Sequence, residues 1–220
     1  MKTYNIYLEG KSDISFLSYF LIYKFDFTLK SSTNKSTELT KQEIKVKLQD
    51  YSTSVNCSGG IDTEKIATVI KEIILDKEEG NEGIIIMDTD TERHSSPRGG
   101  FTERSNFLKK LIGDNEVKYF LIPNNSDDGN IETLLQEIVG TKGKDYYSHL
   151  ENYVDNLNKF KDDNYPKYIE PNSNLEKLKI MWYSYIMHSP KGDECPPTDL
   201  WDLDSNKLDG IYEFLKKVFE

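Results

Sequence analysis

Residues 83–90 read Gly-Ile-Ile-Ile-Met-Asp-Thr-Asp and decide the fold that we expect for this chain. An unbroken apolar run of this length is typical of a strand in the centre of a parallel sheet, where helices cover both faces. Asp88 and Asp90 follow the run directly, and buried carboxylates need a partner because leaving them dry and unpaired is expensive. No strong cationic partner is evident nearby, so a divalent cation is the simplest one.

Short apolar runs alternate with helical patterns along the first two thirds of the chain. We expect strands at Thr3–Leu8, Thr53–Cys57, Gly83–Met87 and Val117–Ile122. We expect helices at Ser12–Tyr23, with Ser12 as N-cap, and at Asp62–Lys77, Thr102–Ile112 and Asn130–Val139. Asp26–Asp50 is polar, with only a weak helical pattern at 40–48, and we interpret it as an excursion from the core. The alternation predicts an α/β fold with a doubly wound parallel sheet of about four strands.

The chain changes character after residue 140. Residues 145–168 are polar and rich in tyrosine, Leu175–Met187 has an amphipathic pattern, and Leu208–Phe219 predicts a terminal helix. The apolar content of this part is too thin for an independent core. We therefore expect a core of residues 1–140 and a helical extension, residues 141–220, packed on it.

Composition excludes several classes of protein. The net charge of −10 argues against a protein that coats nucleic acid by nonspecific attraction, although not against an enzyme that cuts it. Cys57 and Cys195 are far apart and have no ligand-like spacing with the three histidines, which argues against a disulfide and a zinc site. No apolar stretch is long enough for a membrane span or a signal peptide, so we expect a cytoplasmic protein.

Polar residues follow each expected strand. In an open parallel sheet the active crevice lies outside the carboxyl ends of the strands, where such residues meet. Asp13 comes four residues after Glu9, one turn into the first expected helix and on the same side. The residues that follow the four strands are Glu9, then Ser58-Gly59-Gly60, then Asp88 and Asp90, and finally Asp127 and Asp128.

Two motifs make this pattern specific. Glu9-Gly10-Lys11-Ser12-Asp13 and Asp88-Thr89-Asp90 match, in order and spacing, the Glu-Gly-x-x-Asp and Asp-x-Asp motifs of one branch of the Toprim superfamily. The chain resembles the small single-domain proteins of that superfamily related to the nuclease domains of OLD-family (overcoming lysogenisation defect) proteins. The Gly59-Gly60 turn and Pro123–Glu132 also look like this branch. The resemblance covers about the first 140 residues and implies a Toprim-like Rossmannoid core.

The resemblance also implies a cofactor, one or two Mg²⁺ or Mn²⁺ ions. Asp88 and Asp90 would bind metal, Glu9 would be a further ligand or the general base or acid, and Asp13 would help to hold a second ion. Two ions stabilise both the attacking and the leaving oxygen of a phosphodiester. Asp127, Asp128 and Glu132 are candidates for further metal ligands, although acids at a helix N-terminus also complement the helix dipole without metal. The resemblance also implies a lysine that stabilises the transition state, for which Lys177 and Lys179 are the candidates.

Contacts with substrate are expected from a second set of residues. The backbone of Ser58-Gly59-Gly60 would cradle a phosphate, or else form a tight turn that geometry alone requires. The only arginines, Arg93, Arg98 and Arg104, fall within twelve residues beside the proposed metals, and arginine suits bidentate phosphate contacts. We expect Arg93 and Arg98, together with Lys11, to face the substrate.

The resemblance implies a metal-dependent nuclease that cleaves or nicks DNA or RNA, as in bacterial defence against phage. The alternative is a noncatalytic module that binds nucleic acid or protein in a larger defence complex. Haloacid-dehalogenase-like phosphatases share the Asp-x-Asp motif, but their nucleophile follows the first strand and Glu9-Gly10 would stay unexplained. No Gly-x-x-x-x-Gly-Lys-Ser/Thr motif is present, so an ATPase that gates the nuclease would be a separate partner.

Overall fold

The computed structural model describes residues 1–33, 35–51, 63–90, 99–159, 179–180, 182–183 and 200–220. These residues form two compact units. The first consists of Met1–Ile131 and Leu208–Glu220, and the second of Glu132–Lys207. The carboxyl-terminal end of the chain therefore belongs to the same unit as the sheet.

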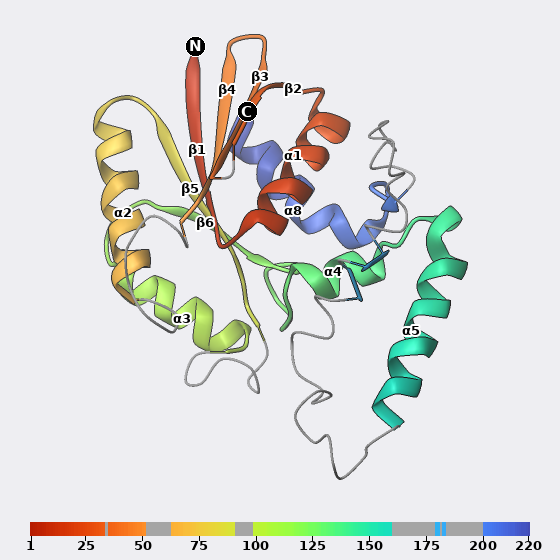
Figure 1. Ribbon diagram of the computed structural model, residues 1–220. Coiled ribbons are helices and arrows are strands. Elements are labelled where there is room, and N and C mark those ends of the chain that lie inside the picture. Colours follow the sequence, from red (N-terminus) through yellow and green to blue (C-terminus); the bar gives the residue numbers. More distant parts are fainter. Residues whose placement is uncertain (34, 52–62, 91–98, 160–178, 181, 184–199) are drawn as a thin grey trace. The chain divides into compact units, whose positions relative to one another are not determined.

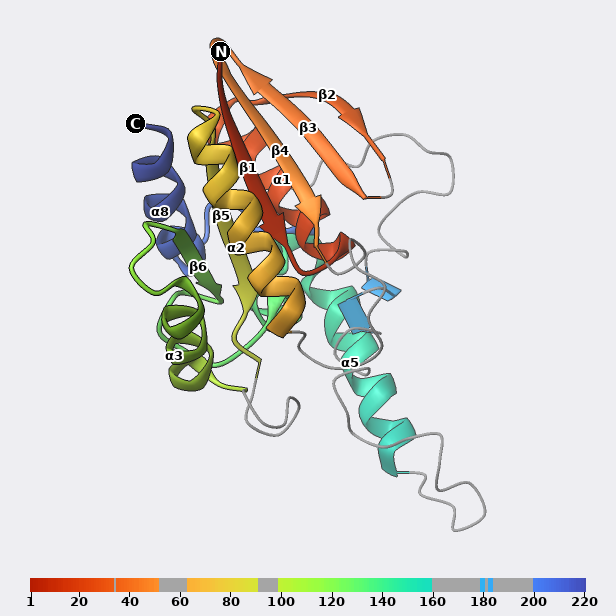
Figure 2. The ribbon, with the colours of Figure 1, turned by 90° about the vertical axis from the view of Figure 1, so that its left-hand side faces the viewer.

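The first unit contains a six-stranded sheet with the strand order β2-β3-β4-β1-β5-β6 (Figures 1 and 2). Its strands are β1 (Lys2–Leu8), β2 (Thr28–Ser32), β3 (Ser36–Lys41), β4 (Ile44–Asp50), β5 (Glu82–Asp88) and β6 (Lys118–Ile122). Neighbours from β4 to β6 pair in parallel, whereas β2–β3 and β3–β4 are antiparallel. The expected α/β class is confirmed, whereas the sheet has six strands and two antiparallel pairs where about four parallel strands were expected.

Helices cover both faces of this sheet (Figure 2). The helices fully within the described residues are α1 (Lys11–Phe25), α2 (Thr63–Glu78), α3 (Phe101–Ile112), α4 (Ile131–Glu137), α5 (Lys144–Lys159) and α8 (Asp209–Phe219), with short 3-10 turns at Thr141–Gly143 and Asn206–Leu208. In the first unit, α2 and α3 lie on one face, and α1 and α8 lie on the other (Figures 1 and 2).

Two apolar layers hold the central strands. Facing α2 and α3, the strand residues Tyr7, Ile85 and Met87 join a buried cluster with Ile73 and Leu108. A Cβ on Gly83 would overlap Ile73, so glycine permits the close approach of α2 to β5. On the other face, α8 packs aromatic rings against the sheet, with Phe219 on Tyr4 and Phe214 on Phe120. Burial on both faces explains the unbroken apolar run of β5.

The interpretation of residues 26–50 as a polar excursion was wrong, because they form β2, β3 and β4. In addition, β4 is the parallel neighbour of β1, while the expected strand Thr53–Cys57 lies outside the described residues. Residues of β3 and β4 alternate, with Leu39, Val46 and Leu48 fully buried. The hairpin turn is Gln42-Glu43, with Gln42 at a φ of 49°, and it lacks the Asn-Gly or Asp-Gly signal of such turns.

Two further details of the helices differ from expectation. Helix α1 begins at Lys11 with Gly10 as N-cap, so Ser12 lies inside the first turn and is not the cap. Helix α5 forms in a segment predicted only as polar and tyrosine-rich. Its buried residues Tyr147, Leu150 and Val154 recur at helical spacing, a signal that the surrounding polar residues masked.

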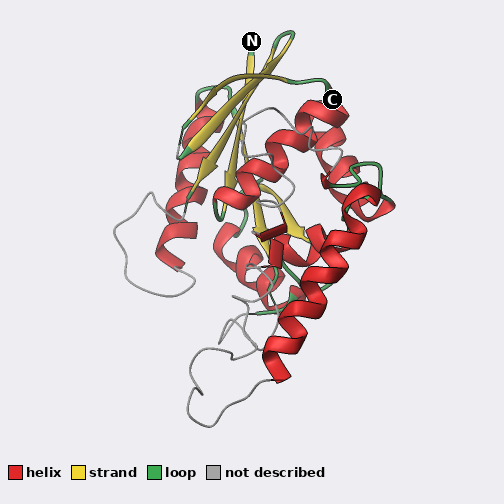
Figure 3. Cartoon of the chain, turned by 45° about the vertical axis from the view of Figure 1, so that its right-hand side comes forward, coloured by secondary structure: helices red, strands yellow, loops and turns green. Residues whose placement is uncertain are grey.

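The second unit is organised around aromatic side chains. The ring of Tyr183 lies edge-on against Tyr147 and against Trp201, and its hydroxyl donates to the carbonyl of Leu200 at 2.9 Å. The described helices, strands and loops are distinguished in Figure 3. Within the described part of the chain, no helix has the length and apolar character that a membrane crossing requires.

Candidate functional site

The carboxyl ends of three parallel strands meet at one edge of the sheet. Glu9 follows β1, Tyr51 follows β4, and Asp88 is the last residue of β5. The strands end nearly level, because Leu8 pairs with Asp50 and Tyr7 pairs with Ile85. The N–H of Tyr51 donates to the carbonyl of Leu8 at 3.0 Å, which fixes the chain where β4 leaves the sheet.

The phenol of Tyr51 shows which charges gather at this edge. Tyr51 is 6% exposed, and burial raises the pKa of its hydroxyl well above the usual value. The negative charge of Glu9 raises this pKa further, while the guanidinium of Arg104 lowers it. The carboxylates of Asp13 and Asp88 act in the same direction as Glu9. Glu9, Asp13, Asp88 and Arg104 therefore all act electrostatically on one buried tyrosine, a residue that the sequence reasoning missed.

Glu9 and Asp13 come from the junction of β1 and α1. Asp13 lies in the first turn of α1 and is only 5% exposed. Oε2 of Glu9 and Oδ1 of Asp13 are both shielded from solvent. A Cβ at Gly10 would lie in ordinary van der Waals contact with Oδ2 of Asp13, at 3.6 Å, so Gly10 directly adjoins this carboxylate. Two acids thus turn inward at the end of one strand, which a globular protein tolerates only with compensating partners.

At the end of β5, the side chain of Asp88 is bonded to the backbone of another segment. Its Oδ1 accepts a hydrogen bond from the N–H of Ile131 at 3.0 Å, in the first residue of α4. This contact links the end of β5 to the segment that follows β6. The carboxylate is half-buried and is therefore both fixed in orientation and reachable from solvent.

Asp90 pairs with a cation that the sequence reasoning overlooked. Nη2 of Arg104 donates to Oδ2 of Asp90 at 2.7 Å, and the Arg104 side chain is fully buried. The premise that no cationic partner is near the acidic residues was therefore wrong. Because Arg104 is buried, it does not face a substrate. Arg93 and Arg98, the two arginines expected to contact substrate, lie outside the described residues.

The backbone around Asp90 is held by a ladder of short contacts. Asp90 has a φ of 56° and exchanges two hydrogen bonds with Gly129, at 2.7 and 3.1 Å. The fully buried Oγ1 of Thr89 accepts from the N–H of Gly129 at 2.8 Å and lies 2.9 Å from the carbonyl of Ile122. Thr89, the middle residue of the Asp-x-Asp motif, thus connects the end of β5 to the segment after β6 through hydrogen bonds.

Asp127 and Asp128 are engaged in local structure. Oδ2 of Asp127 accepts from the side-chain amide of Asn124 at 2.7 Å within the exposed turn after β6. Oδ1 of Asp128 accepts from the backbone N–H of Phe101 at 2.6 Å, the first residue of α3. Asp128 therefore caps a helix, which was the expected alternative to metal ligation. The capped helix is α3 and not α4.

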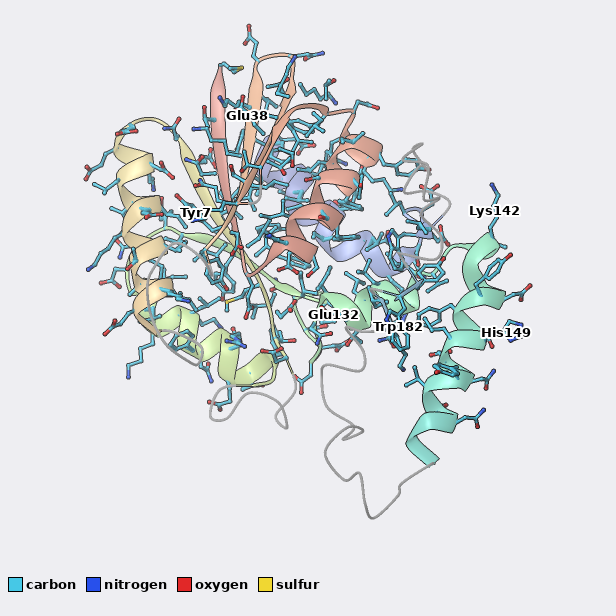
Figure 4. All side chains as sticks on the ribbon, viewed as in Figure 1. Tyr7, Glu38, Glu132, Lys142, His149 and Trp182 are labelled. Carbon is cyan, nitrogen blue, oxygen red and sulfur yellow. The ribbon has the colours of Figure 1, made fainter. Side chains whose placement is uncertain are left out.

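The remaining candidates are placed as follows. Lys11 is exposed at the first position of α1. Glu132, labelled in Figure 4, is buried in the first turn of α4, and Lys179 is buried beside Ile180; both belong to the second unit. Ser58, Gly59 and Gly60 lie outside the described residues.

Removal of the α3 cap should measurably weaken the fold. We expect Asp128→Ala to lower the free energy of unfolding by about 1 kcal/mol, because the N–H of Phe101 loses its acceptor. Urea unfolding followed by circular dichroism measures this loss. Asp128→Asn keeps an oxygen acceptor at the same position and should retain most of the stability; equal losses for both variants would contradict the capping role.

The donor set at the sheet edge suits a hard cation. Mg²⁺ is usually bound through one or two carboxylates and keeps several waters, which leaves positions for phosphate oxygens. Glu9, Asp13 and Asp88 supply only oxygen donors. Among the residues that the structure describes, no group of three or more His, Cys, Asp and Glu side chains is arranged to hold a metal ion.

Comparison with known proteins places the chain in a family. The crystal structure of a hypothetical protein from Pyrococcus horikoshii OT3 is similar to this chain, with a TM-score of 0.47 and 13% sequence identity over 99% of this chain and 100% of that chain. No curated protein matches. The model of the family described as "Protein of unknown function (DUF3226)" matches residues 3–220, and the chain therefore belongs to this family.

Proposed function

We propose that the protein is a divalent-metal-dependent nuclease that cleaves or nicks phosphodiester bonds of DNA or RNA. The observation that supports this function best is the convergence of Glu9, Asp13 and Asp88 on Tyr51, at the carboxyl ends of neighbouring parallel strands. Crowded, partly buried carboxylates are costly unless a cation balances them. A bound Mg²⁺ or Mn²⁺ would supply that charge and polarise a phosphoryl oxygen. The resemblance of both acidic motifs to OLD-like Toprim nucleases points the same way.

Each residue has a distinct role in this proposal. Asp88 would hold the ion, and Glu9 would be a further ligand or would move a proton to or from the reacting oxygen. Tyr51 is protonated at neutral pH, and burial together with the charge of Glu9 raises its pKa further, so the phenol adds no negative charge to the cluster.

A cleavage assay tests the function. Purified protein is incubated with supercoiled plasmid and with single-stranded RNA in Mg²⁺, in Mn²⁺ and in EDTA. We expect cleavage of at least one substrate only with metal, and a decrease of about 100-fold or more for Glu9→Gln. Glu82→Gln is the matched control, since Glu82 is a half-buried glutamate at the first position of β5. Equal cleavage by the wild type and Glu9→Gln would contradict the assigned site.

A noncatalytic binding module is the second candidate, and one observation favours it. Arg104 neutralises Asp90 without metal, and such a pair is also expected where an acidic motif has only a structural role. The same assay separates the two functions. A protein that binds nucleic acid in a mobility-shift experiment but cleaves neither substrate in either metal would be a binding module.

A further inference from the structure

Arg104 is the most deeply buried charged side chain near the acidic cluster. Its exposed fraction is 0%, and Nη2 donates to Oδ2 of Asp90 at 2.7 Å. Within the part of the chain that the structure describes, Nε and Nη1 make no hydrogen bond. The guanidinium therefore acts mainly through its positive charge and less through hydrogen bonds. This charge also lowers the pKa of Tyr51, on which the carboxylates act in the opposite direction.

The fold fixes this cation next to Asp90. Arg104 lies in the first turn of α3, and its N–H donates to the carbonyl of Gly100 at 3.0 Å. The N–H of Gly100 in turn donates to the carbonyl of Thr89 at 2.9 Å. The start of α3 is thus bonded to the residue that precedes Asp90, so the helix and the carboxylate are held as one assembly.

A fixed guanidinium limits what Asp90 can bind. In two-metal sites the ions lie about 3.5 to 4 Å apart and a carboxylate commonly sits between them. A second divalent ion at Oδ2 of Asp90 would lie at contact distance from a cation that is buried and held in place. The repulsion would be strong because screening by water is weak there. Asp90 is therefore already neutralised before any metal arrives.

We propose that Arg104 takes the place of a second metal ion, so that the site holds one divalent cation, on the side of Asp88 and Glu9. This inference rests on the proposed function in one respect, namely that a metal binds at this edge. Asp90 is then a positioning residue, which holds Arg104, and is not an obligatory ligand.

The number of bound ions tests the proposal. The full chain is titrated with Mn²⁺, free Mn²⁺ is followed by electron paramagnetic resonance, and Mg²⁺ is titrated in parallel by calorimetry. We expect one ion per chain. Asp90→Asn retains an oxygen acceptor for Arg104, so this variant should still bind one ion. Its affinity should be about 10-fold lower, as is typical when a residue that supports a metal ligand is changed. Asp88→Asn should bind none at the concentrations that saturate the wild type.

Each outcome has a distinct meaning. Two ions in the wild type, or complete loss of binding in Asp90→Asn, would overturn the role of Arg104 while leaving a metal-dependent nuclease intact. No ion in the wild type would overturn both this role and the metal dependence of the proposed function. One ion with metal-dependent cleavage, retained by Asp90→Asn, supports both.

Discussion

Asp88→Asn is expected to lower the rate of metal-dependent cleavage by about 1,000-fold, because a metal contributes several kcal/mol of transition-state stabilisation and each 1.4 kcal/mol is tenfold in rate. The fold should survive the change. Oδ1 of an asparagine accepts the hydrogen bond from the N–H of Ile131 as the carboxylate does. The loss would therefore reflect the missing charge. Single-turnover cleavage measured at saturating metal, beside urea unfolding without metal, separates chemistry from stability.

Asp76→Asn is the matched control for this variant. Asp76 is also half-buried and also accepts hydrogen bonds, from the amide of Asn5 at 2.8 Å and the hydroxyl of Tyr7 at 3.1 Å. It lies in α2, outside the group of charges around Tyr51. We expect cleavage within about twofold of the wild type, as is usual for a change away from the site. Comparable losses for both variants would mean that lost stability, and not lost metal, explains the result.

The central strands and helices could be predicted from the sequence because each depends on a pattern of neighbouring residues. The apolar run of β5 and the helical pattern of α1 each fall within about a dozen residues, and the acids that follow β1 and β5 mark the strand ends. Since residues at the carboxyl ends of parallel strands meet, Glu9 and Asp88 could be assigned to one edge before the structure was known. Asp13 followed from its position four residues after Glu9, in the first turn of the next helix.

The hairpin β3–β4 was missed because its evidence is not local. Its strands alternate polar and apolar residues, and the polar ones dominate the composition of the segment. Val46 and Leu48 become recognisable as core residues only when β4 pairs with β1, from which it is separated by more than thirty residues of chain. A turn without glycine or asparagine removed the remaining clue.

Tyr51 and Arg104 were missed for a related reason. Tyr51 follows a strand that was not predicted, so it had no assigned edge. Arg104 was noted as part of an arginine cluster with Arg93 and Arg98 but was assigned no role, because sequence shows charge and clustering but not burial. A buried arginine one helical turn into α3 is detectable only when the helix is placed on the sheet, and its partner Asp90 is then identified by contact.

Arg104→Met is expected to cost about 3 kcal/mol of folding stability, the lower end of the range for removing one partner of a buried ion pair. Two features set this value. The guanidinium is fully buried, so its loss leaves the Asp90 charge without compensation in a poorly solvated place, whereas Asp90 itself is 24% exposed and retains some solvation. Methionine extends as far as the Nε position of arginine and so keeps the packing contacts of the side-chain stem. Urea unfolding at neutral pH, without metal, measures the loss.

A double-mutant cycle isolates the ion pair from packing. Asp90→Asn removes the charge but keeps an acceptor for Arg104, and the combination of Arg104→Met with Asp90→Asn leaves neither charge buried. We expect the double variant to lose less stability than the sum of the two single losses, by about 1 kcal/mol or more, since residues in one ion pair are coupled. Additive losses would assign Arg104 a packing role only. Coupling of the expected size would show that the charge of Arg104 stabilises the fold by compensating the charge of Asp90.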